Sequence, residues 1–214
     1  MARVKICGLT RGADVRAAVD AGADAVGVIA DIPVDSPREV DPAAAAELLA
    51  AVPPFVTATL VAMPESAERA VELARTTAPD AIQLHGEWTP DELRFVRAET
   101  ACKLLITIDA DEPARAESFD GVADALVVDS TDESGAGGTG ETHDWTATGT
   151  LATRLTTPVV LAGGLTPENV AEAVQTAEPF AVDVSSGVEL TPGHKDHNAV
   201  ARFVANAGRE VAIV

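Results

Sequence analysis

Short apolar runs alternate with alanine-rich helical stretches along this chain, and the alternation repeats eight times. Most of the runs are apolar throughout, which is typical of parallel strands that are covered on both faces. The expected strands cover residues 3–7, 25–30, 55–62, 81–85, 103–108, 125–129, 158–162 and 181–185.

Helices are expected between these strands, and several have recognisable starting residues. They include residues 42–52, 66–77, 89–99 and 166–177. Ser66, Thr89 and Thr166 are candidate N-caps, because a hydroxyl oxygen can accept a hydrogen bond from a free backbone N–H of the first turn. Pro90 and Pro167 would then occupy the first helical position, where a missing N–H costs nothing.

Eight units of strand followed by helix predict an α/β protein with the (β/α)₈ fold of TIM barrels. An open doubly wound sheet is the alternative, but it would need two more strands than usual and a nucleotide fingerprint that this chain lacks. There is no sign of a linker, so we expect a single barrel domain over residues 1–214. The irregular stretch 129–143 is expected to form a mobile loop after the sixth strand.

The charge of the chain narrows the classes of function. There are 15 Lys and Arg against 34 Asp and Glu, a net charge of −19 that is spread along the sequence. This charge argues against nucleic-acid binding. It indicates adaptation to high salt, because at about 1 M the Debye length is only about 3 Å and surface repulsion is screened.

Two further bulk features concern the compartment. No stretch approaches the roughly 20 apolar residues that span a bilayer, so we expect a cytoplasmic protein without a membrane partner. The two cysteines lie far apart in separate expected strands, at positions 7 and 102, and we expect both to be free thiols.

Polar residues end three of the expected strands, at the side of the barrel where TIM barrels carry their chemistry. These residues are Cys7, His85 and Asp129. A thiol of lowered pKa can remove a proton and a neutral carboxyl can donate one, so Cys7 and Asp129, on opposite sides of the mouth, form a candidate acid–base pair. On the residues alone, a buried structural cysteine and an aspartate that caps a loop remain alternatives.

The loops after the last two expected strands predict an anion site. Gly163 and Gly164 precede an expected helix, and Ser185, Ser186 and Gly187 follow the eighth strand. Glycine lets the backbone approach an anion closely, and a helix N-terminus adds partial positive charge. Either motif alone could be a tight turn, but together they favour a phosphate ligand.

Two other candidates carry less weight on spacing alone. Arg38 suits a carboxylate or a phosphate, but in so acidic a chain a surface counter-charge is the simpler interpretation. His85 could bind a metal, yet no second His or Cys stands at metal-like spacing and "HKDH" (194–197) lies in a separate loop. "GGTG" (137–140) lacks the Lys and Ser/Thr of a nucleotide-binding loop. We therefore expect no metal site.

In combination, these motifs resemble the phosphoribosylanthranilate isomerase family of tryptophan biosynthesis. They are "KICGLT" (5–10), "SPR" (36–38), "QLHG" (83–86), "VVDS" with "GGTG" and "DW" (127–145), "LAGGLTPENV" (161–170) and "DVSSGVE" with "PGHKD" (183–196). The resemblance implies a (β/α)₈ barrel that converts N-(5-phosphoribosyl)anthranilate to 1-(2-carboxyphenylamino)-1-deoxyribulose 5-phosphate. It implies an Amadori rearrangement without cofactor or metal. Whether the protein is a monomer or a homodimer is left open.

The resemblance also implies roles for individual residues. Asp129 resembles the general acid that protonates the ribose ring oxygen, and Cys7 resembles the general base that removes the proton from C2′. Arg38 would hold the anthranilate carboxylate, while the loops at 163–164 and 185–187 would hold the phosphate. His85 and Asp183 fall inside the matching motifs and are expected among the substrate-binding residues.

Some positions depart from the family pattern. The loop before "SPR" carries neither the aromatics nor the basic residue common in the family, Glu141 and His143 replace a basic and an aromatic residue, and the third strand ends in "LVAMPE". These changes concern the packing of the anthranilate ring. Two rivals are the related histidine-pathway isomerase, which carries an aspartate where Cys7 stands, and a barrel that only binds its ligand, against which the presence of both Cys7 and Asp129 counts.

Overall fold

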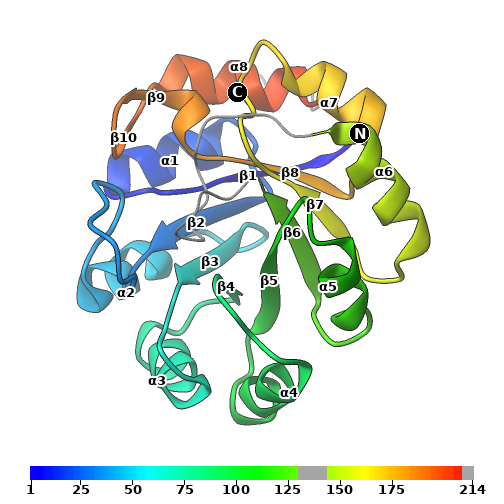
Figure 1. Ribbon diagram of the computed structural model, residues 1–214. Coiled ribbons are helices and arrows are strands. Elements are labelled where there is room, and N and C mark those ends of the chain that lie inside the picture. The colour runs from blue at the N-terminus through cyan, green and yellow to red at the C-terminus, as the bar shows by residue number, and fades with distance from the viewer. Residues whose placement is uncertain (130–143, 209–214) are drawn as a thin grey trace.

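Eight parallel strands close into a barrel in the order in which they occur along the chain (Figure 1). The computed structural model describes residues 1–129 and 144–208. The strands are β1 (Arg3–Ile6), β2 (Ala25–Ile29), β3 (Thr57–Ala62), β4 (Ala81–Leu84), β5 (Lys103–Asp109), β6 (Ala125–Asp129), β7 (Val159–Leu161) and β8 (Ala181–Val184). The predicted (β/α)₈ barrel is confirmed, and the predicted strand limits differ from these by no more than two residues at either end.

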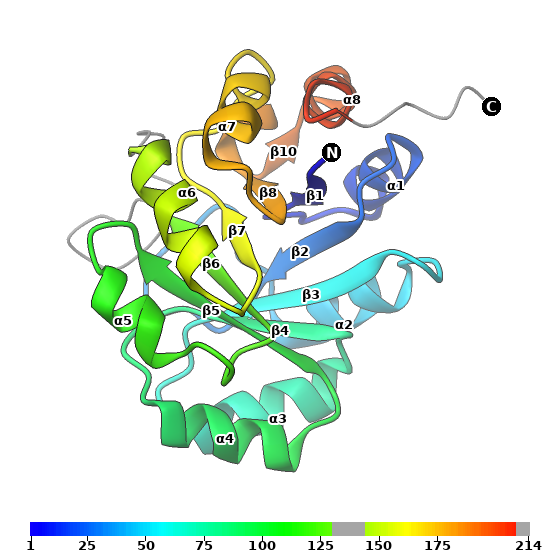
Figure 2. The ribbon, with the colours of Figure 1, turned by 90° about the vertical axis from the view of Figure 1, so that its right-hand side faces the viewer.

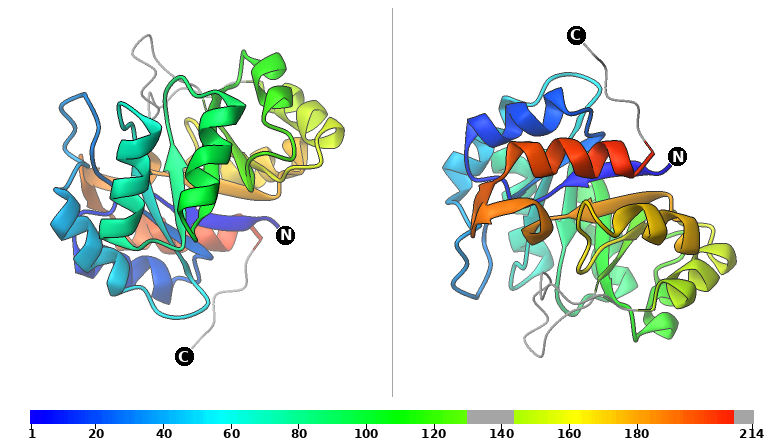
Figure 3. Two further views of the ribbon diagram at one scale, coloured as in Figure 1. Left: turned by 90° about the horizontal axis from the view of Figure 1, so that it is seen from below. Right: turned by 90° about the horizontal axis from the view of Figure 1, so that it is seen from above.

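Helices surround the strands, as Figure 2 shows from the side. They are α1 (Gly12–Asp20), α2 (Pro42–Ala50), α3 (Ala67–Thr77), α4 (Pro90–Glu99), α5 (Pro113–Ser118), α6 (Trp145–Arg154), α7 (Val170–Ala177) and α8 (His197–Asn206). The first and last helices lie side by side, which closes the outer ring as well (Figure 3). Between β8 and α8 stand the 3-10 helix η1 (Ser186–Val188) and a hairpin of β9 (Glu189–Thr191) and β10 (His194–Lys195).

Two of the three predicted N-caps are confirmed. The Ser66 hydroxyl accepts a hydrogen bond from the Arg69 N–H, and Thr89 forms a capping box with Glu92. Pro90 stands in the first turn of α4, as predicted.

The regular helix α7 begins at Val170, four residues after the predicted start at Thr166. The predicted capping interaction is nevertheless present, because the Thr166 hydroxyl accepts a hydrogen bond from the Glu168 N–H at 3.2 Å. The Thr166 carbonyl accepts from the Val170 N–H at 3.1 Å, so the turn over residues 166–169 leads directly into the helix. Asn169 ties this turn to the glycine pair after β7: its side-chain oxygen accepts from the Thr166 N–H at 2.7 Å, and its amide donates to the Gly164 carbonyl at 2.9 Å.

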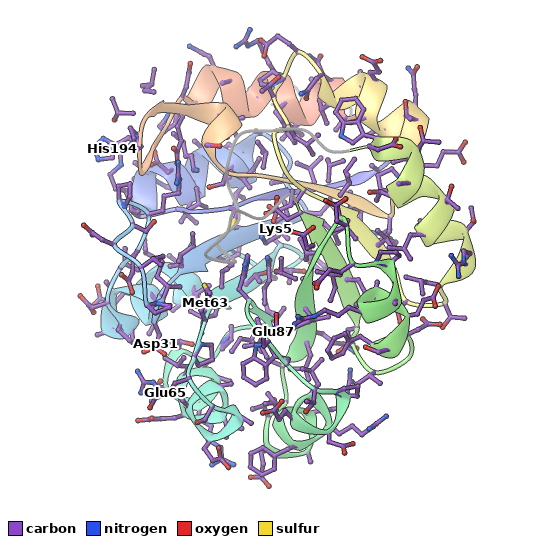
Figure 4. The ribbon with its side chains drawn as sticks, in the orientation of Figure 1. Lys5, Asp31, Met63, Glu65, Glu87 and His194 are labelled. Carbon is purple, nitrogen blue, oxygen red and sulfur yellow. The ribbon has the colours of Figure 1, made fainter. Side chains whose placement is uncertain are left out.

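Apolar side chains fill the layer between strands and helices, but the inside of the barrel is partly polar. Lys5, Thr59, Gln83, Thr107 and Asp183 are all buried on barrel strands. Figure 4 shows Lys5 near the centre of the barrel. The near-continuous apolar runs did not indicate this polar interior.

Three further expectations concern chain-wide features. Both cysteines are free thiols, as predicted. Within the described residues, no helix is long and apolar enough to cross a membrane. The loop expected over 129–143, including the "GGTG" motif, lies outside the described residues beyond its first position.

Candidate active site

One pocket opens at the C-terminal mouth of the barrel, where the strand-end residues were predicted to meet. Its wall includes all ten predicted site residues, Cys7, Arg38, His85, Asp129, Gly163, Gly164, Asp183, Ser185, Ser186 and Gly187. Ten others complete the wall, namely Ile29, Ile32, Val34, Ser36, Val61, Met63, Gln83, Ala162, Leu165 and Val184. The structure therefore brings the predicted residues together at one place.

Cys7 is the first residue after β1, and its backbone N–H donates to the Val184 carbonyl at 2.8 Å. This bond anchors the residue to β8, so the thiol keeps a defined place at the pocket floor. Burial raises the pKa of the thiol, while the positive charges of Lys5 and Lys195 counteract this rise and Asp183 adds to it. The net pKa lies above its ordinary value, so the lowered thiol pKa considered in the sequence analysis is not found.

Asp129 is the last residue of β6 and is buried in the pocket wall. Going round the barrel through β7 and β8, β6 is the third strand from β1. The strand opposite β1 is therefore β5, and the expectation that Cys7 and Asp129 stand on opposite sides is wrong in detail. Both groups line the same pocket, from strands that are not neighbours.

The glycine loops after β7 and β8 are built as an anion site requires. Gly163 and Gly164 have φ angles of 84° and 61°, values that favour glycine. A Cβ on Gly187 would lie 1.9 Å from the Leu165 carbonyl oxygen, so only glycine allows the two loops to meet. The Ser185 hydroxyl is buried and has no hydrogen-bond partner among the described residues.

Arg38 does not stand alone in the pocket, because an ion-paired cluster holds it. Its Nε and Nη2 donate to the two carboxylate oxygens of Glu189 at 2.9 and 2.8 Å. Lys195 Nζ donates to the same carboxylate at 2.8 Å and to the Ser185 carbonyl at 3.0 Å. Arg38 thus lines the pocket within a buried ion-paired cluster and is not an isolated surface counter-charge.

His85 stands one residue past β4 and is neutral at pH 7. Burial and the nearby charge of Lys5 lower its pKa to about 4. The Gln83 amide nitrogen lies 3.2 Å from His85 Nε2. The Gln83 side chain thus contacts the imidazole directly and fixes the place of the ring. The described residues contain no cluster of His, Cys, Asp or Glu that could hold a metal ion.

Asp183 points into the barrel and pairs with a residue that the sequence analysis missed. Its carboxylate accepts a bond from Lys5 Nζ at 2.6 Å, and both side chains are buried. Burial lowers the pKa of Lys5, but the interactions with Asp183 and Cys7 outweigh the effect of burial, so the net pKa of the lysine is raised. The available signal was a lysine inside an apolar strand, two positions before Cys7 and so on the same face.

An apolar wall stands where the sequence departs from the family pattern. Ile29, Ile32, Val34, Val61 and Met63 line one part of the pocket. Two of them come from the loop before "SPR", and Met63 comes from the altered end of β3. The pocket thus joins an apolar region, a guanidinium and the glycine loops after β7 and β8.

Comparison with known proteins agrees with this arrangement. A family model described as "N-(5'phosphoribosyl)anthranilate (PRA) isomerase" matches residues 4–206. An N-(5'-phosphoribosyl)anthranilate isomerase from Halorubrum lacusprofundi, a halophile, is 80% identical over 213 residues, with 100% of each chain covered. The phosphoribosyl anthranilate isomerase of Thermotoga maritima has a solved structure with a TM-score of 0.86 and 36% identity, covering 97% of this chain and 99% of that one. A second structure holds such an isomerase with reduced 1-(o-carboxyphenylamino)-1-deoxyribulose 5-phosphate, at a TM-score of 0.84, 34% identity and the same coverage.

Proposed function

The chain belongs to the N-(5'-phosphoribosyl)anthranilate isomerase family, and from this premise we propose how its own residues carry out the reaction. It isomerises N-(5-phosphoribosyl)anthranilate to 1-(2-carboxyphenylamino)-1-deoxyribulose 5-phosphate, a step of tryptophan biosynthesis. The net charge of −19 and the 80% identity to the halophile relative make it a salt-adapted member. The observation that carries the assignment of roles is a single pocket that joins Cys7, Asp129 and the glycine loops.

The substrate is held at both ends. The phosphate binds the backbone of Gly163, Gly164 and Gly187 with the hydroxyls of Ser185 and Ser186, a placement supported by the close approach of these loops. At the other end, Nη1 of the Glu189-bound Arg38 receives the anthranilate carboxylate.

The anthranilate ring packs on the apolar wall of Ile32, Val34 and Met63. Aliphatic and methionine side chains can cover the face of the anthranilate ring in place of the aromatic side chains common in the family. Neutral His85 and the carboxylate of Asp183 line the same pocket and face the ribose hydroxyls.

Asp129 begins the chemistry as a neutral acid. It donates a proton to the ribose ring oxygen while the bond between that oxygen and C1′ breaks. The lone pair of the anthranilate nitrogen forms the C1′=N bond, so the product of this step is an open-chain protonated Schiff base. Asp129 suits this role because it ends β6 in the wall of the pocket, where a carboxyl group can reach the substrate.

Cys7 completes the rearrangement as a base. Its thiolate removes the proton from C2′, and the electron pair of that C–H bond forms a C1′=C2′ bond while the C1′=N pair returns to nitrogen. The resulting enolamine tautomerises to the ketone. The sum is an isomerisation in which no atom or electron is gained or lost, so a cofactor has no step to perform.

Several broader features belong to the same proposal. Residues 1–214 form one barrel domain that works in the cytoplasm on a small-molecule substrate. It does so without a metal, nucleic acid or membrane. The protein is a monomer or a homodimer; a further solved structure concerns monomers of the dimeric T. maritima enzyme. Light scattering in molar KCl distinguishes the two states.

Loss of anthranilate-type fluorescence tests the assigned roles. Freshly made phosphoribosylanthranilate is mixed with wild type, Cys7→Ser and Asp129→Asn in molar KCl. We expect fast decay in wild type and a fall of about 10²- to 10⁴-fold or more in each variant, the share of one acid or base. Cys102→Ser, which changes the thiol outside the pocket, should keep full activity. A folded Cys7→Ser protein with wild-type turnover would remove the thiol from the mechanism.

A further inference from the structure

Lys5 is a buried cation beside the thiol, and the steps above do not use it. Its side chain and that of Cys7 leave alternate positions of the same strand, so both point toward the inside of the barrel. Lys5 Nζ donates a hydrogen bond to the Asp183 carboxylate at 2.6 Å, and its positive charge acts on the Cys7 thiol. Burying an ammonium group costs free energy unless the charge is paired. In this protein the buried ammonium lies next to the candidate base.

The neighbouring strand leaves space for this pair. Gly27 on β2 has an ordinary backbone conformation, so its φ angle does not require glycine. A Cβ at this position would lie 2.8 Å from Cys7 Sγ and 3.2 Å from both Cε and Nζ of Lys5. The thiol and the ammonium therefore share the volume that a side chain on β2 would occupy.

The charges around the thiol come from three strands. Lys5 lies on β1, Asp183 on β8 and Lys195 on β10, while β2 contributes the uncharged Gly27. Lys5 is the strongest of the three influences on the thiol, and only burial exceeds it. Both cations are also paired with a carboxylate, Lys195 with Glu189 and Lys5 with Asp183, so what distinguishes Lys5 is its place two residues before Cys7 on the same side of the chain.

We propose that Lys5 is a positioning residue that favours the thiolate form of Cys7, and that Asp183 keeps the ammonium in place for this purpose. The proposal deepens the assignment of Cys7 as the base and rests on it. Without the ammonium, the proton would have to leave a buried thiol with no adjacent cation to stabilise the anion. Lys5 thus lowers the free-energy cost of forming the thiolate that removes the proton from C2′.

Alkylation of Cys7 tests this proposal without depending on turnover, because only the thiolate attacks iodoacetamide. A Cys102→Ser background leaves Cys7 as the only thiol in the chain. The rate is measured against pH in molar KCl for this protein and for Lys5→Met added to it. We expect the midpoint to move up by at least about one pH unit, with a rate at least about tenfold lower at any pH below both midpoints and an unchanged plateau at high pH.

Two matched variants separate charge from structure. Lys103→Met removes an exposed lysine at the start of β5 and should leave the midpoint unchanged. Lys5→Met/Asp183→Asn removes both buried charges, so it leaves no lone carboxylate to unfold the protein, and it should also raise the midpoint. A folded Lys5→Met or double variant with the wild-type midpoint overturns the proposal. A lower plateau with an unmoved midpoint does so too, because it signals a structural role only.

The same proteins are assayed for turnover, which keeps the two proposals distinct. If Cys7→Ser remains active, the assignment of the base fails while the alkylation profile still reports on Lys5. If Cys7→Ser is inactive and Lys5→Met leaves the midpoint unmoved, only the role of Lys5 fails.

Discussion

Glu189→Gln is the substitution from which we expect the largest single loss of stability. The Glu189 carboxylate accepts three hydrogen bonds from cations, two from Arg38 and one from Lys195. Its side chain is 5% exposed, that of Lys195 is 1% exposed and that of Arg38 is 20% exposed. A neutral amide would leave two cations inside the pocket without a counter-charge.

The magnitude follows from this burial. Removing one partner of a buried ion pair costs about 3–5 kcal/mol, because the remaining charge is uncompensated. Arg38 retains some contact with solvent, so we expect about 3 kcal/mol at the lower end of that range. For a chain of this size, that corresponds to a fall in melting temperature of about 6–12 °C.

Thermal unfolding followed by circular dichroism in molar KCl is the assay, and Glu99→Gln is the matched control. Glu99 pairs with Arg75 at 2.7 Å, but these side chains are 45% and 60% exposed. Exposed pairs contribute no more than about 1 kcal/mol and are screened by salt. If Glu189→Gln melts no lower than Glu99→Gln, the buried cluster does not stabilise the mouth and the reasoning is refuted.

The pH dependence of stability provides a second test with the same variant. Burial opposes ionisation of Glu189, but Arg38 and Lys195 outweigh it and hold its pKa below the usual value. The contribution of ionised Glu189 to the free energy of unfolding is therefore complete above the pKa of the unfolded chain, about 4.3, and is lost as the pH falls through the lower pKa of the folded protein. Wild type and Glu189→Gln should converge in stability below that range.

Three other perturbations have defined outcomes. Gly187→Ala places a methyl group 1.9 Å from the Leu165 carbonyl oxygen and should raise the KM for the substrate at least about tenfold. The control is Gly12→Ala, whose new methyl group would have a movable arginine end as its nearest neighbour, at 3.5 Å, and should leave the KM unchanged. Equal KM values for the two variants would contradict the phosphate assignment. The free energy of unfolding, measured by urea titration, should fall as the pH drops from about 6.5 toward about 4, because His85 binds a proton in the unfolded chain but stays neutral in the folded one. His85→Asn should flatten this slope, and an unchanged slope would count against the low pKa of His85. Transfer from molar KCl to dilute buffer should lower the melting temperature of so acidic a protein, and a constant value would argue against salt adaptation.

The barrel could be predicted because its signals are local. Apolar runs identified the strands, and capping residues placed three of the four helix starts named from the sequence to within one residue. The fourth, α7, begins its regular part at Val170 although Thr166 makes the expected capping bond. Its first turn is also held by the bond from Asn169 to the Gly164 carbonyl, a contact with the preceding loop that no helix signal in the sequence reports.

The site was predictable where a residue type is unusual at a strand end, as for Cys7 and Asp129. Its supporting ion pairs were not. Glu189 belongs to a conspicuous motif, but nothing in the spacing shows that its carboxylate meets Arg38, which lies 151 positions earlier. Lys5 and Asp183 are 178 positions apart and meet only because β1 and β8 are neighbours in the closed barrel.

That last contact also has a bearing on how the protein is made. The thiol stands at the seventh residue, yet Asp183 and Lys195, which share its surroundings, belong to the final part of the chain. A nascent chain therefore carries the proposed base early in synthesis, but the charges of Asp183 and Lys195 reach the thiol only after the eighth strand has docked against the first. Recovery of enzyme activity after dilution from denaturant would accordingly time the closure of the barrel, and fragments lacking the last strand would be catalytically silent.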